Sequence, residues 1–141
     1  MAEFLERIES PEVQALYEGL EDRWNARAAC LNARLEEAGL PVRVANLSTI
    51  WTMTYTRPGR YNWMLQYYLR AEGLALSWVG TGRFIFSLNY TDADFAEVVE
   101  RIVAAARKME ADGWWWNDGT LTDKGIRRRI LKEMLVHRFL K

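Results

Sequence analysis

Residues 50–56 read IWTMTYT, and large apolar side chains alternate there with threonines. Alternate side chains of a β-strand point to opposite faces of the sheet. The stretch therefore predicts a strand that packs on its Trp-Met-Tyr side and is wetter on its threonine side. Val42 and Val44 flank Arg43 and predict a neighbouring strand. We predict two further strands, 74–78 and 83–90, joined through Gly80-Thr81-Gly82.

A long helix is predicted ahead of these strands. Ser10 and Pro11 supply an N-cap and a proline at the first helical position. Apolar residues at helical spacing then continue as far as Gly39 and Pro41, which form a stop signal. We expect one helix of about 28 residues, roughly 42 Å long at 1.5 Å per residue. Residues 2–9 are expected to form a separate helical lead-in.

Two more helices complete a domain that we assign to residues 1–112. A short one follows the turn at 57–60 and ends at Gly73. The other begins at Thr91, which fits a capping box with Asp94. The order α-β-β-α-β-β-α predicts an α+β fold, a two-layer sandwich in which helices cover a small, mostly antiparallel sheet. The core face of the last helix would carry Phe95, Val98, Val99, Ile102, Ala106 and Met109.

Residues 113–141 are predicted to form an appendage, a Trp-rich linker followed by a basic helix from Thr122. Trp114, Trp115 and Trp116 cannot all face one core, because neighbouring side chains diverge. We therefore name them as candidate residues for docking on a partner. Residues 124–141 carry seven basic side chains against Glu133 alone, a net charge of +6, and the remaining chain carries −6. These basic residues spread around the helix, so we expect a solvated face rather than a nucleic-acid site.

Composition excludes several classes of protein. The chain has 141 residues, half of them hydrophobic, and 19 basic side chains balance 19 acidic ones, which indicates a globular domain. Cys30 and His137 are the only residues of their kinds, which rules out a disulfide framework and a zinc site of Cys and His ligands within one chain. We expect Cys30 to be a small buried hydrophobe and His137 to lie in a surface or packing position.

Covalent carbonyl chemistry and membrane insertion are also disfavoured. A Schiff-base lysine must have a depressed pKa, and each lysine of this chain lies in a helical or terminal segment of high local charge. No apolar run reaches the roughly 18 residues of a membrane span, and the N-terminus is unlike a signal peptide. We expect a cytoplasmic protein. The lysines are Lys108, Lys124, Lys132 and Lys141.

Several strings, in this order, resemble a known family. They are LNARLEEAGLP at 31–41, the strand at 48–55, GLAL at 73–76, and FIFSL at 84–88 running into TDADF at 91–95. From about Phe4 to Asp112 the chain resembles the C-terminal small domain of class III, fold-type I pyridoxal-phosphate (PLP) aminotransferases, nearest to the glutamate-1-semialdehyde aminomutase branch.

The resemblance implies a role inside a larger enzyme. Members carry the cofactor lysine and most PLP contacts in a large domain that precedes this region, and no part of this chain matches that domain. The chain is then a fragment or a separately encoded small domain that helps to close an active site, binds no PLP alone and is inactive alone. Its partner would be the missing large PLP-binding domain or a second copy of the chain.

Arg83 is the residue to which the resemblance assigns a role. Several class III members have an Arg-Phe-x-Pro-Pro-Leu string here, whose arginine pairs with a substrate carboxylate or a nearby acid. Arg83 and Leu88 keep the spacing, whereas Phe86 and Ser87 replace the prolines. A planar guanidinium suits a carboxylate because it donates two parallel hydrogen bonds. A solvated strand-edge arginine or a structural ion pair remains the alternative.

A departure from the family pattern keeps other functions open. The aminomutase branch usually has a Pro-Ser-x-Phe-Glu string between the last two strands, where this chain has WVGTG at 78–82. An alternative reading is a freestanding module that binds a small ligand or a protein through its sheet face or its Gly80–Gly82 loop.

Overall fold

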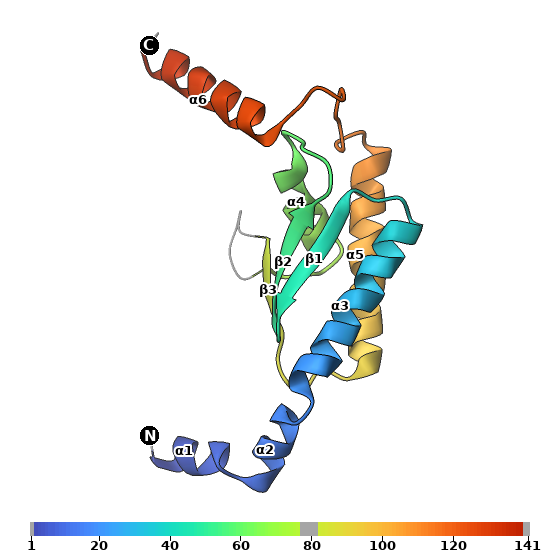
Figure 1. Cartoon of the computed structure of the whole chain (residues 1–141), viewed down its shortest axis with the longest axis vertical. Coiled ribbons are helices and arrows are strands. Elements are labelled where there is room, and N and C mark those ends of the chain that lie inside the picture. Colours follow the sequence, from blue (N-terminus) through green and yellow to red (C-terminus); the bar gives the residue numbers. More distant parts are fainter. Residues whose placement is uncertain (1, 77–81, 140–141) are drawn as a thin grey trace.

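The structure, a computed structural model, describes residues 2–76 and 82–139 (Figure 1). Within them it is the predicted α+β fold, with helices packed on one face of a three-stranded antiparallel sheet. The strands are β1 (Val42–Leu47), β2 (Ile50–Tyr55) and β3 (Arg83–Ile85). The helices are α1 (Ala2–Ile8), α2 (Pro11–Tyr17), α3 (Leu20–Glu37), the 3-10 helix η1 (Asn62–Met64), α4 (Leu65–Ala71), α5 (Asp92–Ala111) and α6 (Asp123–Phe139).

The prediction of one long first helix is wrong, because the chain forms α2 and α3 with a break between them. The predicted start is confirmed: the Ser10 hydroxyl accepts a hydrogen bond from the amide of Val13, and Pro11 begins the helix. The break falls at Glu18, which is extended, and at Gly19, whose φ of 64° is left-handed. Glycine adopts this conformation without a Cβ clash. The lead-in helix is confirmed as α1.

The sheet has the order β1-β2-β3, and both neighbouring pairs are antiparallel. The predicted faces of β2 are confirmed where the strand crosses the core, since Trp51 and Met53 are buried against the helices. Tyr55, at the end of the strand, is 37% exposed, so the packing side ends before it.

The strand predicted at 74–78 is wrong in its described part. Residues 74–76 form no strand, because the amide of Leu74 donates to the carbonyl of Leu69 and so completes the end of α4. Gly73 ends that helix as predicted, with a φ of 81°. Residues 77–81, which hold the rest of this strand and most of the predicted connection, lie outside the described residues.

The strand predicted at 83–90 is confirmed only over its first part, β3. The amide of Phe86 still donates to the carbonyl of Thr49 at 3.0 Å, and the chain then turns toward α5. Thr91 and Asp94 form the predicted capping box at the start of that helix. The helix after the turn at 57–60 is also present, as η1 and α4.

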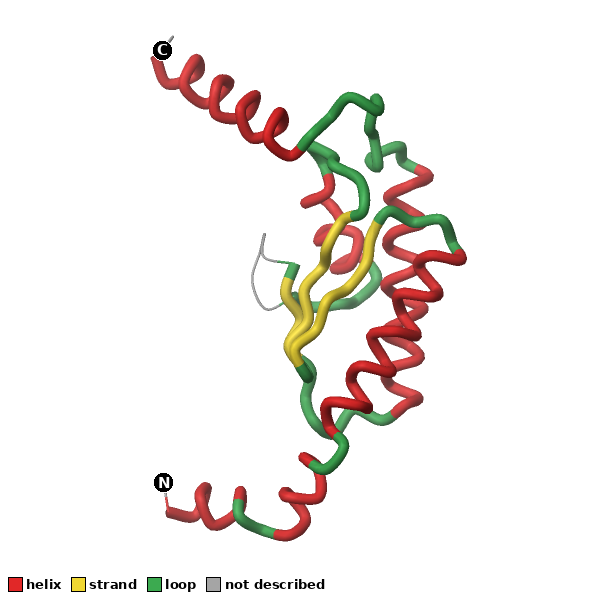
Figure 2. The backbone as a smooth tube through the Cα atoms, viewed as in Figure 1, coloured by secondary structure: helices red, strands yellow, loops and turns green. Residues whose placement is uncertain are grey.

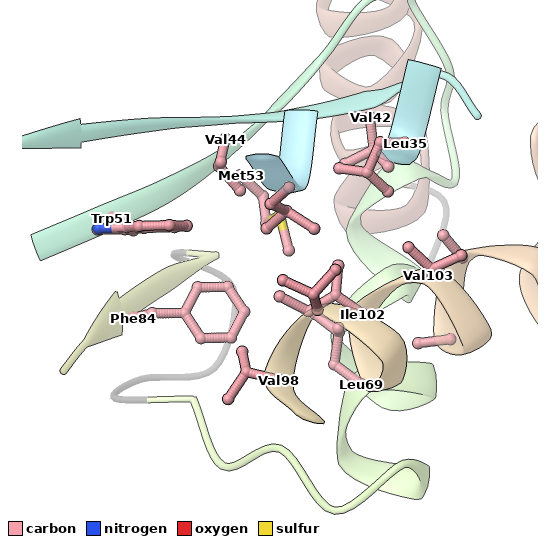
Figure 3. Packing of buried hydrophobic residues seen from close by; sticks show 14 of the residues in the cluster. Leu35, Val42, Val44, Trp51, Met53, Leu69, Phe84, Val98, Ile102 and Val103 are labelled. Carbon is pink, nitrogen blue, oxygen red and sulfur yellow. The ribbon is translucent and has the colours of Figure 1, made fainter. Parts of the chain in front are cut away.

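The core lies between the sheet and the helices α3, α4 and α5 (Figure 3). An aromatic cluster fills its centre: Trp24 stacks on Phe86 at 5.2 Å between ring centroids, and Trp51 meets Phe95 edge-on at 5.3 Å. Such pairs add to the stabilisation from burial. The predicted core face of α5 is confirmed, since all its residues are buried: Phe95, Val98, Val99, Ile102, Ala106 and Met109.

One side chain of α3 covers the outer edge of β1. The Asn32 carboxamide donates to the carbonyl of Val44 at 3.0 Å and accepts from the amide of the same residue at 2.8 Å. Both backbone groups point away from β2, and the side chain supplies the bonds that another strand would make.

Two helical arms extend from this core toward the side that the helices leave uncovered (Figure 1). One arm is α1 with α2, and the other is α6. They lie at opposite ends of the molecule's longest axis, so the outline is concave on the uncovered side of the sheet (Figure 2). None of the helices within 2–76 and 82–139 is long and apolar enough to cross a membrane.

Candidate functional site

The uncovered face of the sheet is the first candidate site. Residues paired directly across strands point to the same face of the sheet. Trp51 is buried against the helices, so its neighbour Ile50 and the partners of Ile50 point to the uncovered face. Leu47, Ile50 and Ile85 therefore form one row across all three strands on the uncovered face. They are 71%, 46% and 63% exposed. A row of large apolar side chains in solvent indicates a surface made for contact.

Arg83 lies in the next row of the same face. It is exposed at the start of β3, directly opposite Thr52, which in turn is opposite Ala45. The strand is held on both sides of it, because the carbonyl of Gly82 accepts from the amide of Met53 at 2.9 Å and Phe86 bonds to the loop between β1 and β2. The structure thus presents a guanidinium over small neighbours and beside an apolar row.

The opposite side of the sheet offers little room near this position. A cavity of about 30 Å³ lies between the end of β2 and α4, and Tyr55, Gln66 and Gly82 border it. That volume holds about one or two waters, not a substrate. Partial burial of its phenol raises the pKa of Tyr55 from its ordinary value of 10 to about 12. The wider, uncovered face is therefore the better candidate for a ligand or partner.

The three tryptophans separate as their spacing requires. Trp114 and Trp115 pack against the core, and the Trp115 indole donates its N–H to the carbonyl of Ala106 at 3.0 Å. Trp114 meets Tyr61 edge-on at 5.3 Å. Trp116 is 49% exposed. Of the three candidate docking residues, Trp116 is the one whose side chain faces solvent most.

The helix α6 buries no residue. An ion pair connects this helix to the turn before η1. The two terminal nitrogens of Arg60 donate hydrogen bonds to the carboxylate of Glu133, one of them at 2.8 Å. These bonds hold the pKa of Glu133 below its usual range. The predicted start at Thr122 is confirmed, since its hydroxyl accepts from the amide of Gly125. His137 is exposed, in agreement with its predicted surface role.

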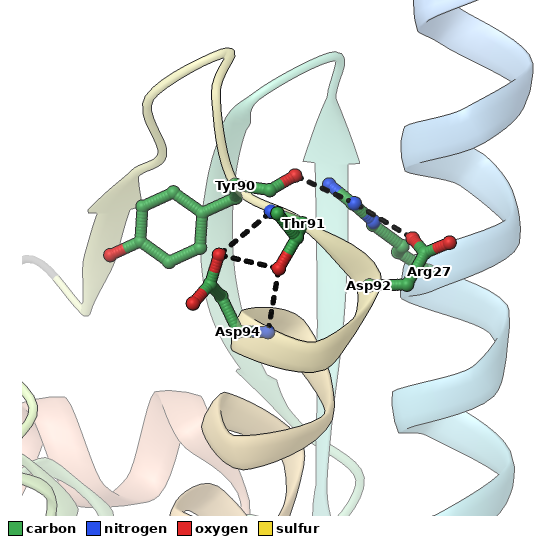
Figure 4. A network of polar contacts seen from close by, with 5 residues as sticks. All are labelled: Arg27, Tyr90, Thr91, Asp92 and Asp94. Atoms are coloured by element: carbon green, nitrogen blue, oxygen red, sulfur yellow. Dashed lines mark hydrogen bonds and ion pairs between the residues drawn. The ribbon is translucent and has the colours of Figure 1, made fainter.

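A second hollow, of about 480 Å³, lies between α3 and α5 on the far side from the open sheet. Arg27 borders it and is 8% exposed. Its guanidinium donates to the carbonyl of Tyr90 at 2.9 Å and to the carboxylate of Asp92 at 2.8 Å, beside the Thr91 capping box (Figure 4). It also lies 4.6 Å from the ring centroid of Trp24. These contacts tie the start of α5 to α3.

The side chains around this hollow therefore connect α3 to α5, and the arginines that border it are bonded within the chain. Its other bordering arginines also bond within the chain, because Arg34 pairs with Glu100 at 2.7 Å and Arg23 donates to backbone carbonyls. Sequence reasoning missed the role of Arg27. The signal was its position three residues after Trp24 and four before Leu31, on the buried stripe of the helix.

Cys30 corrects another expectation, since it is exposed and borders the same hollow. The apolar stripe of α3 runs through Trp24, Leu31 and Leu35, and position 30 falls beside it, toward solvent. An alanine-rich neighbourhood predicted a helix correctly but did not decide which way this side chain points.

The described residues do not fit PLP as a covalently held cofactor. A lysine that holds it must be desolvated. Lys108, Lys124 and Lys132 are all exposed, and Lys108 pairs with Glu72. Within 2–76 and 82–139 no group of three His, Cys, Asp or Glu side chains is placed so that it could hold a metal ion.

Comparison with known proteins identifies the fold. No family model matches the chain, and no curated protein matches its sequence. Among solved structures, a transaminase with PLP bound is similar over 76% of this chain, with a TM-score of 0.59 and 19% sequence identity. The match covers 26% of that transaminase, so this chain corresponds to about a quarter of its length. The chain therefore has the fold of one part of a PLP-bound transaminase.

Proposed function

We propose that this chain serves as the small domain of a cytoplasmic, PLP-dependent class III aminotransferase or aminomutase, docked on a larger domain that holds the cofactor. The observation that carries the proposal is the similarity to part of a transaminase with PLP bound. The strings at 31–41 and 84–95 favour the glutamate-1-semialdehyde aminomutase branch. In this proposal the chain supplies binding and closure, and the chemistry of PLP takes place on the partner.

The uncovered sheet face is where the larger domain would dock. A sheet with helices on one face and apolar side chains on the other gains stability when a second layer covers it. Leu47, Ile50 and Ile85 supply the apolar part of that contact. Their row spans the full width of β1, β2 and β3 and leaves no strand out of the interface.

Arg83 would then face the docked domain from the row beside this apolar contact. Water is excluded where two layers meet, and a charge-assisted hydrogen bond strengthens in such a place. Arg83 would bind a substrate carboxylate through two parallel N–H groups and orient it toward the cofactor. Its cross-strand neighbours in this row, Thr52 and Ala45, are both small.

Purification of the tagged full-length chain from its native cells tests the proposal. We expect a larger polypeptide to co-purify, with the visible absorbance of bound PLP and transamination activity on amino acids. Ile85→Glu should break the association, because it places a charge in the apolar row. Ala96→Glu, an equal change on the exposed side of α5, should leave it intact.

The role of Arg83 is tested in the same complex. Arg83→Lys should raise the KM for carboxylate substrates and leave PLP content and folding unchanged, because a point charge cannot replace the bidentate fork. Unchanged kinetics would assign Arg83 a structural role. A folded chain that purifies alone and without PLP would contradict the proposal and favour the freestanding binding module.

A further inference from the structure

The two arms carry opposite charges. We call residues 2–22 the acidic arm, with seven acidic side chains and Arg7 as its one basic side chain, and residues 124–141 the basic arm. The acidic arm has a net charge of −6, and residues 124–141 have +6. Residues 23–123 hold eleven charges of each sign and are neutral overall. The whole charge asymmetry of the chain therefore lies in its two ends, which Figure 1 shows far apart.

Most charged side chains of the two arms form no ion pair within the described part of the molecule. The one acid of the basic arm, Glu133, pairs with Arg60 and Arg129. No other ion pair between described residues involves either arm, although intramolecular pairs are frequent on the core. The acidic side chains without one are Glu3, Glu6, Glu9, Glu12, Glu18, Glu21 and Asp22, and the basic ones on α6 are Lys124, Arg127, Arg128, Lys132 and Arg138.

Both arms also expose apolar side chains. In α2, Leu16 and Tyr17 are 40% and 51% exposed, and neither α2 nor α6 buries any residue. In α6, Leu131, Met134 and Phe139 are 58%, 65% and 78% exposed. Most of the stability of a helix in a protein comes from packing of one face, and α6 has no buried residue. Each arm therefore presents exposed apolar side chains together with a net charge of one sign. The net charges of the two arms are opposite, so their surfaces are complementary.

The arms of one molecule cannot meet, because they stand at opposite ends of the longest axis (Figures 1 and 2). Both project to the same side, however. A two-fold rotation about the shortest axis, the viewing direction of Figure 1, brings a second copy to that side with its ends exchanged. The acidic arm of each copy then meets the basic arm of the other, and the assembly closes with two equal contacts.

We infer that two copies of this chain form an antiparallel, two-fold symmetric dimer in which the acidic arm of each copy binds the basic arm of the other. A dimer that joins like arms would place charges of one sign together, which costs affinity. The opposed pairing gains both Coulomb attraction and burial of the exposed apolar side chains. The inference does not rest on the proposed function, since it uses the arms and not Arg83 or the apolar row of the sheet. The second copy lies on the side of the uncovered sheet face, so this dimer is a state of the chain alone, and a larger domain docked on that face would take the place of the second copy.

Sedimentation equilibrium of the full-length chain tests the dimer. We expect dimers that dissociate as the ionic strength rises from about 0.01 M to about 1 M, because the Debye length falls from about 30 Å to about 3 Å over that range. A chain that stays monomeric at every concentration at low salt overturns the inference. A dimer that does not respond to salt overturns it as well, since its contacts would not be those of the arms.

Charge reversal identifies the surfaces. The acidic-arm variant carries Glu3→Lys, Glu6→Lys and Glu12→Lys, and the basic-arm variant carries Arg127→Glu, Arg128→Glu and Lys132→Glu. Each alone should weaken the dimer by at least about tenfold, because like charges now face each other. The matched control reverses three exposed arginines of the core and should dimerise normally: Arg57→Glu, Arg70→Glu and Arg107→Glu.

Recombining the variants gives the decisive result. An equimolar mixture of the acidic-arm and basic-arm variants should form a heterodimer, because every contact again joins opposite charges. A single chain that carries all six substitutions should recover the homodimer. If neither recovers while circular dichroism shows folded chains, the arms do not pair. If the basic-arm variant alone loses binding to an RNA or to an anionic vesicle and dimerisation is unaffected, α6 serves that ligand and the inference is wrong.

Discussion

The helices α5 and α6 have 20 and 17 residues, yet they differ completely in what they touch. α5 buries eight residues in the core, and α6 buries none. Both begin in the same way, with a threonine hydroxyl that accepts a backbone amide three residues later, at Thr91 and at Thr122. The same kind of local cap therefore starts both helices, and tertiary packing separates what they do next.

This difference separates a part of the chain that stabilises the fold from a part available for association. Helical stability in proteins comes mostly from burial of one face. The buried face of α5 meets α3, α4 and the sheet (Figure 3). The exposed face of α6 has no such partner among the described residues. We expect substitutions in α5 to change the free energy of unfolding and equivalent substitutions in α6 to change association instead.

The largest contrast is expected between two phenylalanines. Phe95→Ala should lower the free energy of unfolding by about 3 to 5 kcal/mol, because Phe95 is 4% exposed and leaves a cavity among aromatic rings. Phe139→Ala, at a side chain 78% exposed, should change it by less than about 0.5 kcal/mol. Urea unfolding of both variants, at a concentration where the chain is monomeric, measures the difference. Equal losses would show that α6 belongs to the folding unit and would break the comparison.

An intermediate contrast is expected between adjacent tryptophans in the linker between the two helices. Trp115→Ala should cost about 2 to 3 kcal/mol, since it removes a partly buried indole and its hydrogen bond to Ala106. Trp116→Ala should leave the thermal midpoint nearly unchanged, because about half of its surface is exposed. Thermal melts of the two variants locate where the core ends and the basic arm begins. A destabilising Trp116→Ala would move that boundary toward α6.

The smallest contrast uses the two threonine caps. Thr91→Ala should cost about 1 kcal/mol in global stability, and Thr122→Ala should cost almost none, because fraying of α6 does not expose the core.

The cap at Thr91 can also be tested by changing the pH at which the chain is unfolded. Hydrogen bonds from the hydroxyl and the amide of Thr91 hold the pKa of Asp94 below its usual value. The stabilisation that these hydrogen bonds give is fully present at pH values above the usual pKa of an aspartate. It is lost as the pH falls through the lowered pKa of Asp94.

The stability gap between wild type and Thr91→Ala should therefore narrow as the chain is unfolded at lower pH. A gap that stays constant down to acidic pH would show that the carboxylate of Asp94 takes no part in the cap. Denaturant unfolding at a series of pH values makes this measurement.

Features with a local cause could be predicted from the sequence. Alternation identified β1 and β2, and capping residues identified the starts of α2 and α5, because neighbouring residues alone determine those conformations. The break at Gly19 was not predicted, because the apolar spacing continues through it. Only the backbone conformation shows that α2 ends there and that α3 begins as a separate helix. The strand predicted at 74–78 failed over 74–76 because the end of α4 takes the amide of Leu74.

The candidate site depended more on long-range contacts. The sequence placed Arg83 on a strand, but its position on the uncovered face follows from its register with Thr52. Likewise, spacing showed that the three tryptophans diverge, whereas only the fold selects Trp114 and Trp115 for the core. The buried role of Arg27 depends on Tyr90 and Asp92, more than sixty residues away.

The bond pair from Asn32 to Val44 bears on how this chain behaves in a crowded solution. A bare strand edge is a template on which a foreign extended segment can add itself, and such addition is a first step toward amyloid-like aggregates. The carboxamide of Asn32 occupies the donor and the acceptor that such a segment would need at the middle of β1. A single side chain thus blocks strand addition at the middle of this edge, whereas the two arms keep their surfaces exposed.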